Sequence, residues 1–170
     1  NDTYYTTYDI NASCTWFYES GTYNGKRGII KNGKILLPMI FNYDYGQYDD
    51  NVILSIDGVH GMYNLTMEKW VIPLAFKALY YVDEGLYGVK KTDKHGIINA
   101  QGDLIVDYEW DYISSIYGLN GYVSVQKGEY PNAKYGVYHT ATKKLVIPCK
   151  YSSISKQYYS CSLKINTINH

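Results

Sequence analysis

Short runs of alternating apolar and polar residues recur along the chain. Residues 51–57 and 122–127 alternate with a period of two, and a glycine follows each run, which is typical of half-buried strands that end in tight turns. A first run of this kind spans Cys14 to Glu19. No stretch keeps the helical period of about 3.6; residues 69–81 come nearest, and Pro73 interrupts them. The pattern therefore predicts an all-β protein.

The runs belong to a repeated unit that is marked by one glycine. In each copy this glycine is followed by two apolar residues, a turn and a continuous apolar run. Successive marking glycines lie 33, 35 and 40 residues apart, a spacing typical of solenoids, propellers and arrays. The spacing predicts a single repeat domain over 1–170, with a partial repeat at 1–25 and full repeats at about 26–58, 59–93, 94–133 and 134–165. We call these residues the anchor glycines; they are Gly28, Gly61, Gly96 and Gly136.

Each full copy is predicted to contain three short strands. The first strand holds the anchor glycine, and a turn connects it to the second strand. The second strand is a continuous apolar run, which indicates cover on both faces. Pro38, Pro73 and Pro148, or Asp107 in the third full copy, are expected to close this strand, since neither residue type favours a continued ladder. A polar and aromatic connection then leads to the third strand.

The repeats are expected to form a solenoid-like, twisted array of stacked short antiparallel strands and hairpins. A repeat needs no central core of its own, because it buries its apolar face on its neighbours. Closure into a small β-propeller is the alternative, since the strand over 14–19 would then complete a blade begun by the C-terminus.

Charge and composition narrow the range of partners. The chain has 16 Lys and Arg against 16 Asp and Glu, so it has no field that attracts nucleic acid or an anionic membrane. No apolar run is long enough to span a membrane. Tyrosine is unusually common, with 22 residues against 3 Phe. Its ring packs on half-buried strands while its hydroxyl stays in water, which also suits it to contact proteins and sugars.

Three cysteines are present, and their spacing fits neither a CxxC pair nor a zinc site. Cys14, Cys149 and Cys161 each lie in an apolar strand pattern, so buried thiols are expected. A Cys149–Cys161 bridge is the alternative for a secreted chain. The chain begins at Asn1 without an initiator methionine, which suggests a processed or excised segment.

The order of residues within a copy resembles the tryptophan-glycine (WG) repeat family of bacterial proteins. The shared order is an anchor glycine, two apolar residues, a turn with glycine, an apolar run with Val-Ile-Pro, a Tyr-Asp-x-Ile segment and a Val-x-Val strand. The resemblance extends over about residues 8–165. It implies a repeat architecture that is found often in cell-envelope or secreted proteins, with no shared enzymatic activity. The tryptophan before the anchor glycine is replaced here by Arg27, His60, His95 and Tyr135.

Carboxylate pairs give little support to an enzyme. Asp49 with Asp50, and Asp107 with Asp111, are pairs of the kind that a glycosidase uses, yet both lie where turns favour aspartate. No nucleophile elbow, HExxH, phosphate-binding or dinucleotide-binding motif occurs in the sequence. The sequence therefore favours a protein that is not an enzyme.

The residues before the anchor glycines form the predicted binding site. They stay large and able to hydrogen bond while their identity changes between copies, whereas the most similar positions are fold-building Gly, Pro and aliphatic residues. His60 and His95 share this position, but a catalytic zinc site needs a third ligand, so neither a metal nor another cofactor is expected. The alternative is that these side chains only cover the neighbouring glycine. The predicted contact residues are Arg27, His60, His95 and Tyr135, with the flanking aromatics Trp110 and Tyr112.

The sequence thus predicts a non-catalytic binding or scaffolding module for a protein or glycan partner, at the cell envelope or within a larger assembly. The alternative is an accessory or catalytic domain of a hydrolase that acts on envelope glycans. The resemblance implies a location outside the cytoplasm, and a cytoplasmic location is the alternative. Repetition favours binding, because an enzyme needs one asymmetric site.

Overall fold

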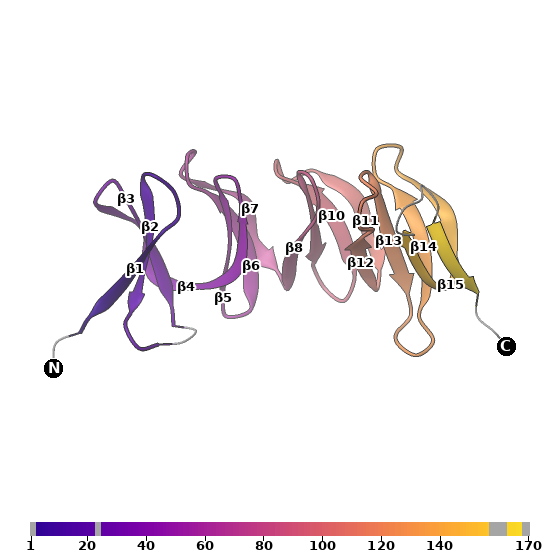
Figure 1. Cartoon of the computed structure of the whole chain (residues 1–170), viewed down its shortest axis with the longest axis horizontal. Coiled ribbons are helices and arrows are strands. Elements are labelled where there is room, and N and C mark those ends of the chain that lie inside the picture. The colour runs from indigo at the N-terminus through magenta and orange to yellow at the C-terminus, as the bar shows by residue number, and fades with distance from the viewer. Residues whose placement is uncertain (1–2, 23–24, 157–162, 168–170) are drawn as a thin grey trace. The chain divides into compact units, whose positions relative to one another are not determined.

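The computed structural model describes residues 3–22, 25–156 and 163–167, which form β-strands joined by turns and loops (Figure 1). No helix occurs within these ranges, so none of them contains a helix that would cross a membrane.

The chain divides into two compact units, unit 1 over 1–75 and unit 2 over 76–170. The strands of unit 1 are β1 (Tyr5–Asp9), β2 (Cys14–Glu19), β3 (Arg27–Lys31), β4 (Lys34–Tyr48), β5 (Asn51–Ile56), β6 (Val59–Asn64) and β7 (Lys69–Phe76), which ends at the unit boundary. Those of unit 2 are β8 (Ala78–Asp83), β9 (Leu86–Lys90), β10 (His95–Asn99), β11 (Leu104–Trp110), β12 (Tyr112–Ser115), β13 (Tyr122–Lys127), β14 (Lys134–His139), β15 (Lys144–Lys156) and β16 (Leu163–Thr167).

Strands that follow one another in sequence are also neighbours in the sheets. Unit 1 holds a seven-stranded sheet in the order β1 to β7. Unit 2 holds a four-stranded sheet in the order β11-β10-β9-β8 and a five-stranded sheet in the order β12 to β16. Among the described strands no sheet closes on itself, and the paired strands are antiparallel. An all-β repeat protein of short antiparallel strands is thereby confirmed; an open array or a closed propeller for the whole chain stays a prediction.

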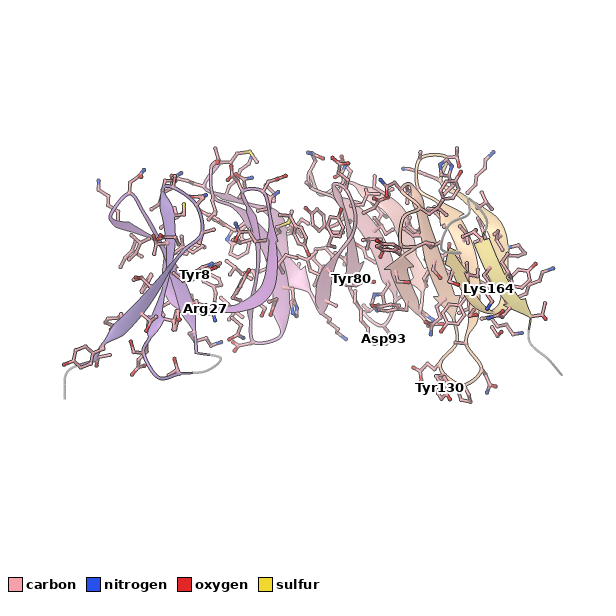
Figure 2. The ribbon with its side chains drawn as sticks, in the orientation of Figure 1. Tyr8, Arg27, Tyr80, Asp93, Tyr130 and Lys164 are labelled. Carbon is pink, nitrogen blue, oxygen red and sulfur yellow. The ribbon has the colours of Figure 1, made fainter. Side chains whose placement is uncertain are left out.

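The second and third full repeats each contain four strands, β6 to β9 and β10 to β13, so the expectation of three is wrong for them. The first full repeat contains three, β3 to β5, and the described part of the fourth contains β14 to β16. β4 pairs with β3 through Phe41 and with β5 from Asn42 onward, so one long strand takes two places of the first full repeat. In unit 2 the same two places are taken by β11 and β12. Segments 42–48, 78–83 and 112–115 look like connections in the sequence because tyrosines and charged residues break the apolar alternation. They form strands because tyrosine suits a half-buried strand position, as Tyr80 of β8 does (Figure 2).

Three anchor glycines, Gly28, Gly96 and Gly136, face a bulge in the neighbouring strand. In unit 2, His95 pairs with Trp110 and Ile97 pairs with Val106. β11 therefore has more residues between these two pairs than β10 has, which makes a bulge in β11. A β-carbon on Gly96 would lie 2.6 Å from the Val106 carbonyl oxygen. Glycine is therefore required by the close approach of two strands within one sheet. The obstacle is equivalent at the other anchors: the carbonyl oxygens of Leu37 at Gly28, Ile72 at Gly61 and Ile147 at Gly136, at 2.7, 2.9 and 2.5 Å.

The prolines lie inside strands, which corrects the expectation that they close the second strand. β4 continues through Pro38 and β15 continues through Pro148, and Asp107 lies inside β11 in the same way. Proline cannot donate to a ladder, but the bulge leaves residues 38–40 without a register partner in β3. A missing N–H is therefore tolerated there, and the strand resumes its pairing at Phe41.

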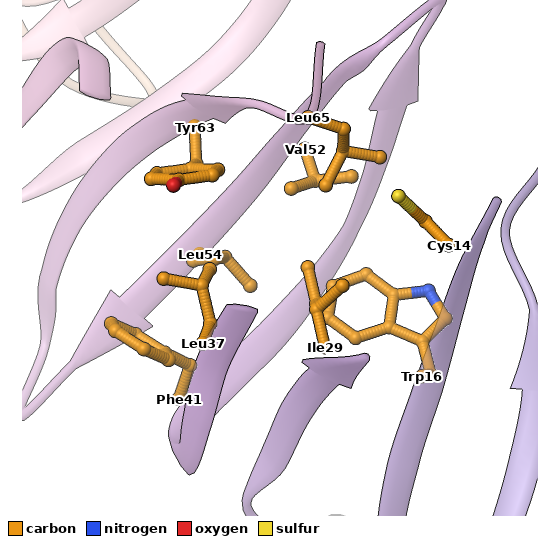
Figure 3. Close-up of a cluster of buried hydrophobic side chains, with 9 residues drawn as sticks. All are labelled: Cys14, Trp16, Ile29, Leu37, Phe41, Val52, Leu54, Tyr63 and Leu65. Carbon is orange, nitrogen blue, oxygen red and sulfur yellow. The ribbon is translucent and has the colours of Figure 1, made fainter. Parts of the chain in front are cut away.

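A core of large apolar side chains holds unit 1 together. Side chains of β5 and β6 point toward those of β2, β3 and β4 (Figure 3). Trp16 is 1% exposed, and its ring centroid lies 4.8 Å from that of Tyr43. Burial of each such side chain stabilises the fold by roughly 1.5–3 kcal/mol. The core consists of Cys14, Trp16, Ile29, Leu37, Phe41, Val52, Leu54, Tyr63 and Leu65.

The core of unit 2 lies between its four-stranded and five-stranded sheets. Ile97 and Val106 from the first sheet belong to one cluster with Ile113, Val123 and Val125 from the second, and none is more than 1% exposed. This packing brings the edge strands β8 and β12 into contact. Side chains from both sheets therefore meet along these edges.

The cysteines follow the expectation only in part. β2 begins at Cys14, as predicted, and Cys14 is a buried free thiol. Cys149 is half-buried, and its Sγ donates to the Val125 carbonyl oxygen at 3.5 Å. Burial raises the pKa of the Cys149 thiol. Cys161 lies outside the described residues, and Cys149 is a free thiol, which does not support the alternative of a Cys149–Cys161 bridge.

Candidate functional site

The residues before the anchor glycines occupy equivalent positions in cross-strand rows. Tyr135 is half-buried and pairs with Gln126 and Tyr151, and Gln126 pairs in turn with Tyr112. Two predicted site residues, Tyr112 and Tyr135, therefore belong to one row across the five-stranded sheet. Two others share a row of the four-stranded sheet, which consists of Ala78, Lys90, His95 and Trp110.

In unit 1 the two row residues contact their own neighbours. The Arg27 guanidinium carbon lies 4.9 Å from the ring centroid of Tyr18 and 5.3 Å from that of Tyr43. His60 Nε2 lies 3.3 Å from Asp44 Oδ2. Both row residues are half-buried. Cation–π contacts of Arg27 and the contact between His60 and Asp44 thus hold these side chains against β2 and β4 while part of each stays at the surface.

His95 lies within an aromatic cluster that joins the two sheets of unit 2. It is 6% exposed, and its ring centroid lies 5.8 Å from that of Tyr80 and 5.3 Å from that of Tyr112. The rings of Tyr80 and Tyr112 are stacked at 5.7 Å with an interplanar angle of 12°. The Tyr80 hydroxyl donates to the Ile113 carbonyl oxygen at 2.7 Å. The cluster therefore connects β8 and β10 to β12.

The hydrogen bonds of Tyr80 determine the tautomer of His95. The single hydroxyl proton of Tyr80 goes to Ile113, so the Tyr80 oxygen accepts the hydrogen bond from His95 Nδ1–H, at 3.0 Å. Burial lowers the pKa of His95, Lys90 lowers it further, and Asp111 acts in the opposite direction. Burial also raises the pKa of Tyr80 well above its usual value. Both side chains are therefore neutral near pH 7 and serve as a clamp between the sheets.

Trp110 is buried at the same junction, whereas Tyr112 reaches the surface. Trp110 is 4% exposed, and Lys127 Nζ lies 4.5 Å from its ring centroid while donating to the Glu109 carbonyl oxygen. The ring of Tyr138 meets Trp110 edge-on at 6.3 Å. Trp110 Nε1 is buried and has no hydrogen-bond partner in the part of the chain that the structure describes. Tyr112 is 44% exposed, so it is the member of this group that a partner can reach.

One carboxylate of each acid pair that the sequence offered is hydrogen-bonded within a loop. Asp111 accepts hydrogen bonds from Lys94 Nζ and from the Gly128 backbone N–H, the latter at 2.6 Å. The Lys94 hydrogen bond, followed by that of Gly128, holds the pKa of Asp111 below its usual value. Asp50 accepts a hydrogen bond from the Thr66 hydroxyl at 2.5 Å. Within the described ranges, no group of three or more His, Cys, Asp or Glu residues is placed to hold a metal ion.

A pocket that none of the predicted site residues lines opens in unit 2, between the end of β8 and the loop 116–121. It encloses about 170 Å³. Tyr117 is 84% exposed and Tyr81 is 43% exposed at its rim. The Asp83 carboxylate accepts a hydrogen bond from Gly121 N at 2.6 Å. The sequence signal that could have indicated this pocket is the 40-residue spacing between anchor glycines, the longest of the three spacings. A longer spacing indicates an insertion, and insertions in repeat proteins fall in loops that often bind ligands.

The four-stranded meander and the anchor glycine that faces a bulge define the chain as an antiparallel β-repeat protein. A family model described as WG containing repeat matches residues 61–94 and 96–130. These two stretches of the chain are therefore similar to WG containing repeats, which confirms the resemblance seen in its sequence. The two matched stretches overlap the second and third predicted full repeats; the repeat boundaries themselves stay predictions. The comparisons with curated proteins and with solved structures found no match.

Proposed function

We propose that the chain is a non-catalytic binding or scaffolding module that contacts a protein or a glycan through exposed tyrosines. The observation that carries this proposal is the number of tyrosine rings that the strands and loops leave at the surface. A tyrosine ring supplies a large contact area with little loss of side-chain entropy, and tyrosine is enriched at the centres of interfaces. The exposed rings are Tyr4, Tyr5 and Tyr8 in unit 1 and Tyr81, Tyr112, Tyr117 and Tyr130 in unit 2, each at least 43% exposed.

Tyr112 is the predicted contact residue that fits this proposal best. Almost half of it is accessible, while its ring stacks on Tyr80. That support fixes the ring before a partner arrives, which lowers the entropy lost on binding. The half-buried residues Arg27, His60 and Tyr135 are secondary contacts. The two buried members of the predicted site support the rings around them.

The carboxylates favour binding over hydrolysis of a glycan. A glycoside hydrolase needs two carboxyl groups on opposite sides of the scissile bond, one of which exchanges a proton with the substrate. Asp111 is held ionised by Lys94 and Gly128, and Asp50 is bonded to Thr66. Both carboxylates support loops, and the lowered pKa of Asp111 makes it a poor proton donor.

We also propose a location outside the cytoplasm, at the cell envelope or in a larger secreted assembly of a bacterium. This part rests on the resemblance to WG repeat proteins. Fractionation of cells that express the complete gene product, followed by detection with an antibody, tests it. Recovery of the protein with cytoplasmic markers would reject this location.

Binding is tested by co-sedimentation with purified bacterial cell-wall glycan and by chemical crosslinking to envelope proteins. We expect the wild-type chain to be retained by one of these partners. A folded variant in which Tyr81, Tyr112 and Tyr117 are changed to alanine should lose retention by about tenfold or more. Retention by neither partner, or equal retention of the triple variant, would reject the proposal.

A matched control replaces three exposed apolar residues of unit 2 instead, and it should be retained like the wild type. The residues are Leu104, Leu145 and Val146, which are 42%, 42% and 49% exposed. The supernatants are also assayed for newly formed reducing ends. Their release from the glycan would favour the hydrolase alternative.

A further inference from the structure

We propose that the pocket between β8 and the loop 116–121 is a subsite for one neutral sugar ring. This inference rests on the proposed binding function and deepens it, because it names the class of ligand and the residues that hold it. The pocket belongs entirely to unit 2. Its main side chains are Tyr81, Asp83, Ser115, Tyr117, Asn120 and Tyr122.

The pocket is built by a segment that departs from the repeat. The equivalent turns, between β4 and β5 and between β8 and β9, are short, at 49–50 and 84–85. The loop at 116–121 is three times as long. Insertions in a repeat array form loops on one face, and loops on a rigid scaffold are where binding residues gather. The fold therefore gains one asymmetric feature at this place.

Hydrogen bonds fix the loop before any ligand binds. Gly121 N donates to Asp83 Oδ2 at 2.6 Å, which ties the loop to the end of β8. Thr140 N donates to the Gly121 carbonyl oxygen at 2.9 Å, and Leu119 N donates to that of Ile116 at 3.0 Å. A site ordered in advance loses less conformational entropy when it binds.

The pocket presents aromatic rings and polar groups in the combination that a sugar ring needs. Tyr117 and Tyr81 are exposed at its rim, and the negative face of an aromatic ring attracts the slightly positive C–H groups of a sugar. The exposed Asn120 amide offers two donor hydrogens and an acceptor oxygen for hydroxyls. Each oxygen of Asp83 accepts one backbone N–H, so about two acceptor positions remain for hydroxyl donors.

Charge and size favour a neutral sugar over other ligands. The described lining contains the carboxylate of Asp83 and no Lys, Arg or His, so sulfated, phosphorylated or uronic sugars would be repelled. The volume of about 170 Å³ is below the ~300–1,000 Å³ of pockets for drug-sized ligands, which suits one ring with the rest of an oligosaccharide outside. An extended peptide would need an open strand edge. Here β8 and β12 are in contact, and Tyr80 bonds to Ile113 across them.

The test is binding of the whole chain to an array of neutral oligosaccharides, followed by calorimetric titration of the strongest ligand. The array includes chitotetraose and cellotetraose, and tetragalacturonate serves as the charged comparison. We expect saturable binding of a neutral sugar and binding of tetragalacturonate that is weaker by about tenfold or more. Tyr117→Ala and Asn120→Ala should each weaken the affinity about tenfold, because each removes a direct contact.

Tyr130→Ala is the matched control. Tyr130 is 92% exposed and lies on another long loop of the same sheet, at 128–133 (Figure 2). Its replacement should leave the affinity within about twofold of the wild type, since the pocket does not include it. Circular dichroism confirms that the three exposed substitutions keep the fold.

Two results would overturn the inference, and both differ from a failure of the proposed function. Binding of a neutral sugar that Tyr117→Ala and Asn120→Ala leave unchanged would place the sugar elsewhere, with glycan binding intact. Binding of no neutral oligosaccharide would reject this ligand class. If crosslinking to an envelope protein is then lost in Tyr117→Ala, the pocket binds a protein segment. The proposed function itself fails only when neither wall glycan nor envelope protein is retained.

Discussion

Replacing Gly96 tests the strand packing that defines the repeat. An added β-carbon would lie 2.6 Å from the Val106 carbonyl oxygen and 3.1 Å from Tyr108 Cδ1. The carbonyl belongs to the backbone of β11, so it cannot rotate away as a side chain would. Alanine or valine at this position therefore forces β10 and β11 apart, toward the 3.4 Å at which ordinary contact begins.

The expected loss of stability follows from that separation. The φ of Gly96 lies outside the left-handed region, so the contact alone is responsible. Overpacking of this kind typically costs about 1–3 kcal/mol, and a weakened ladder hydrogen bond adds about 1 kcal/mol. We expect Gly96→Ala to lower the free energy of unfolding by about 2–3 kcal/mol and Gly96→Val to lower it by about 3–4 kcal/mol.

Urea denaturation followed by circular dichroism and tryptophan fluorescence measures the effect. Gly33→Ala is a control for backbone strain, because no atom lies within 4 Å of its added carbon while its φ is +77°. It should cost about 1–2 kcal/mol. A Tyr108→Ala background removes the side-chain contact and keeps the carbonyl. An unchanged urea midpoint for Gly96→Ala, or its full rescue by Tyr108→Ala, would refute the reasoning.

Three further changes probe the junction between the sheets of unit 2. Tyr80→Phe leaves two buried partners without a hydrogen bond and should lower the free energy of unfolding by about 1–2 kcal/mol in thermal denaturation. Tyr130→Phe, at the surface, should lower it by less than about 0.5 kcal/mol. The pKa of His95 is lowered in the folded state, so the unfolded chain takes up a proton at a higher pH than the folded chain does. The free energy of unfolding should therefore be highest above pH 6.5 and decrease as the pH drops below that value. This decrease should be smaller in His95→Gln, which lacks the imidazole. Lys94→Met should raise the pKa of Asp111 toward 3.8 in an NMR titration and cost about 0.5 kcal/mol above that pH, a loss that disappears as Asp111 is protonated.

The fold class was predictable because its signals are local. Period-two alternation and the recurring anchor glycines depend on neighbouring residues only, so they appear in the sequence whatever the packing. The extra strand β12 of the third repeat was missed because Tyr112 and the residues after it are too polar to resemble a strand. The prolines led to the wrong prediction that the second strand ends early. In the sequence Pro38 resembles a strand end, and only the register with β3 shows that it lies in a bulge.

The sequence predicted which candidate site residues occupy equivalent positions, but it did not predict which of their side chains are exposed. Equivalent repeat positions fall in equivalent cross-strand rows, which is why Tyr112 and Tyr135 share one row. The burial of His95 depends on β12, a strand of the next sheet, whose Tyr112 covers it. Such packing between sheets leaves no trace in the spacing of residues. The pocket at Tyr117 is formed by a loop that the other repeats lack, so residues compared between equivalent repeat positions do not reveal it.

Amide hydrogen exchange, with and without the partner retained in the sedimentation or crosslinking assay, tests the central claim most directly. That claim is that exposed tyrosines of the strand edges and loops carry most of the binding, while buried repeated positions such as His95 stabilise the fold. The account predicts that the largest slowing of exchange on binding occurs within residues 78–83 and 112–122, with no change in β10. Slowing that is largest in β10, or no change in any segment, would contradict it.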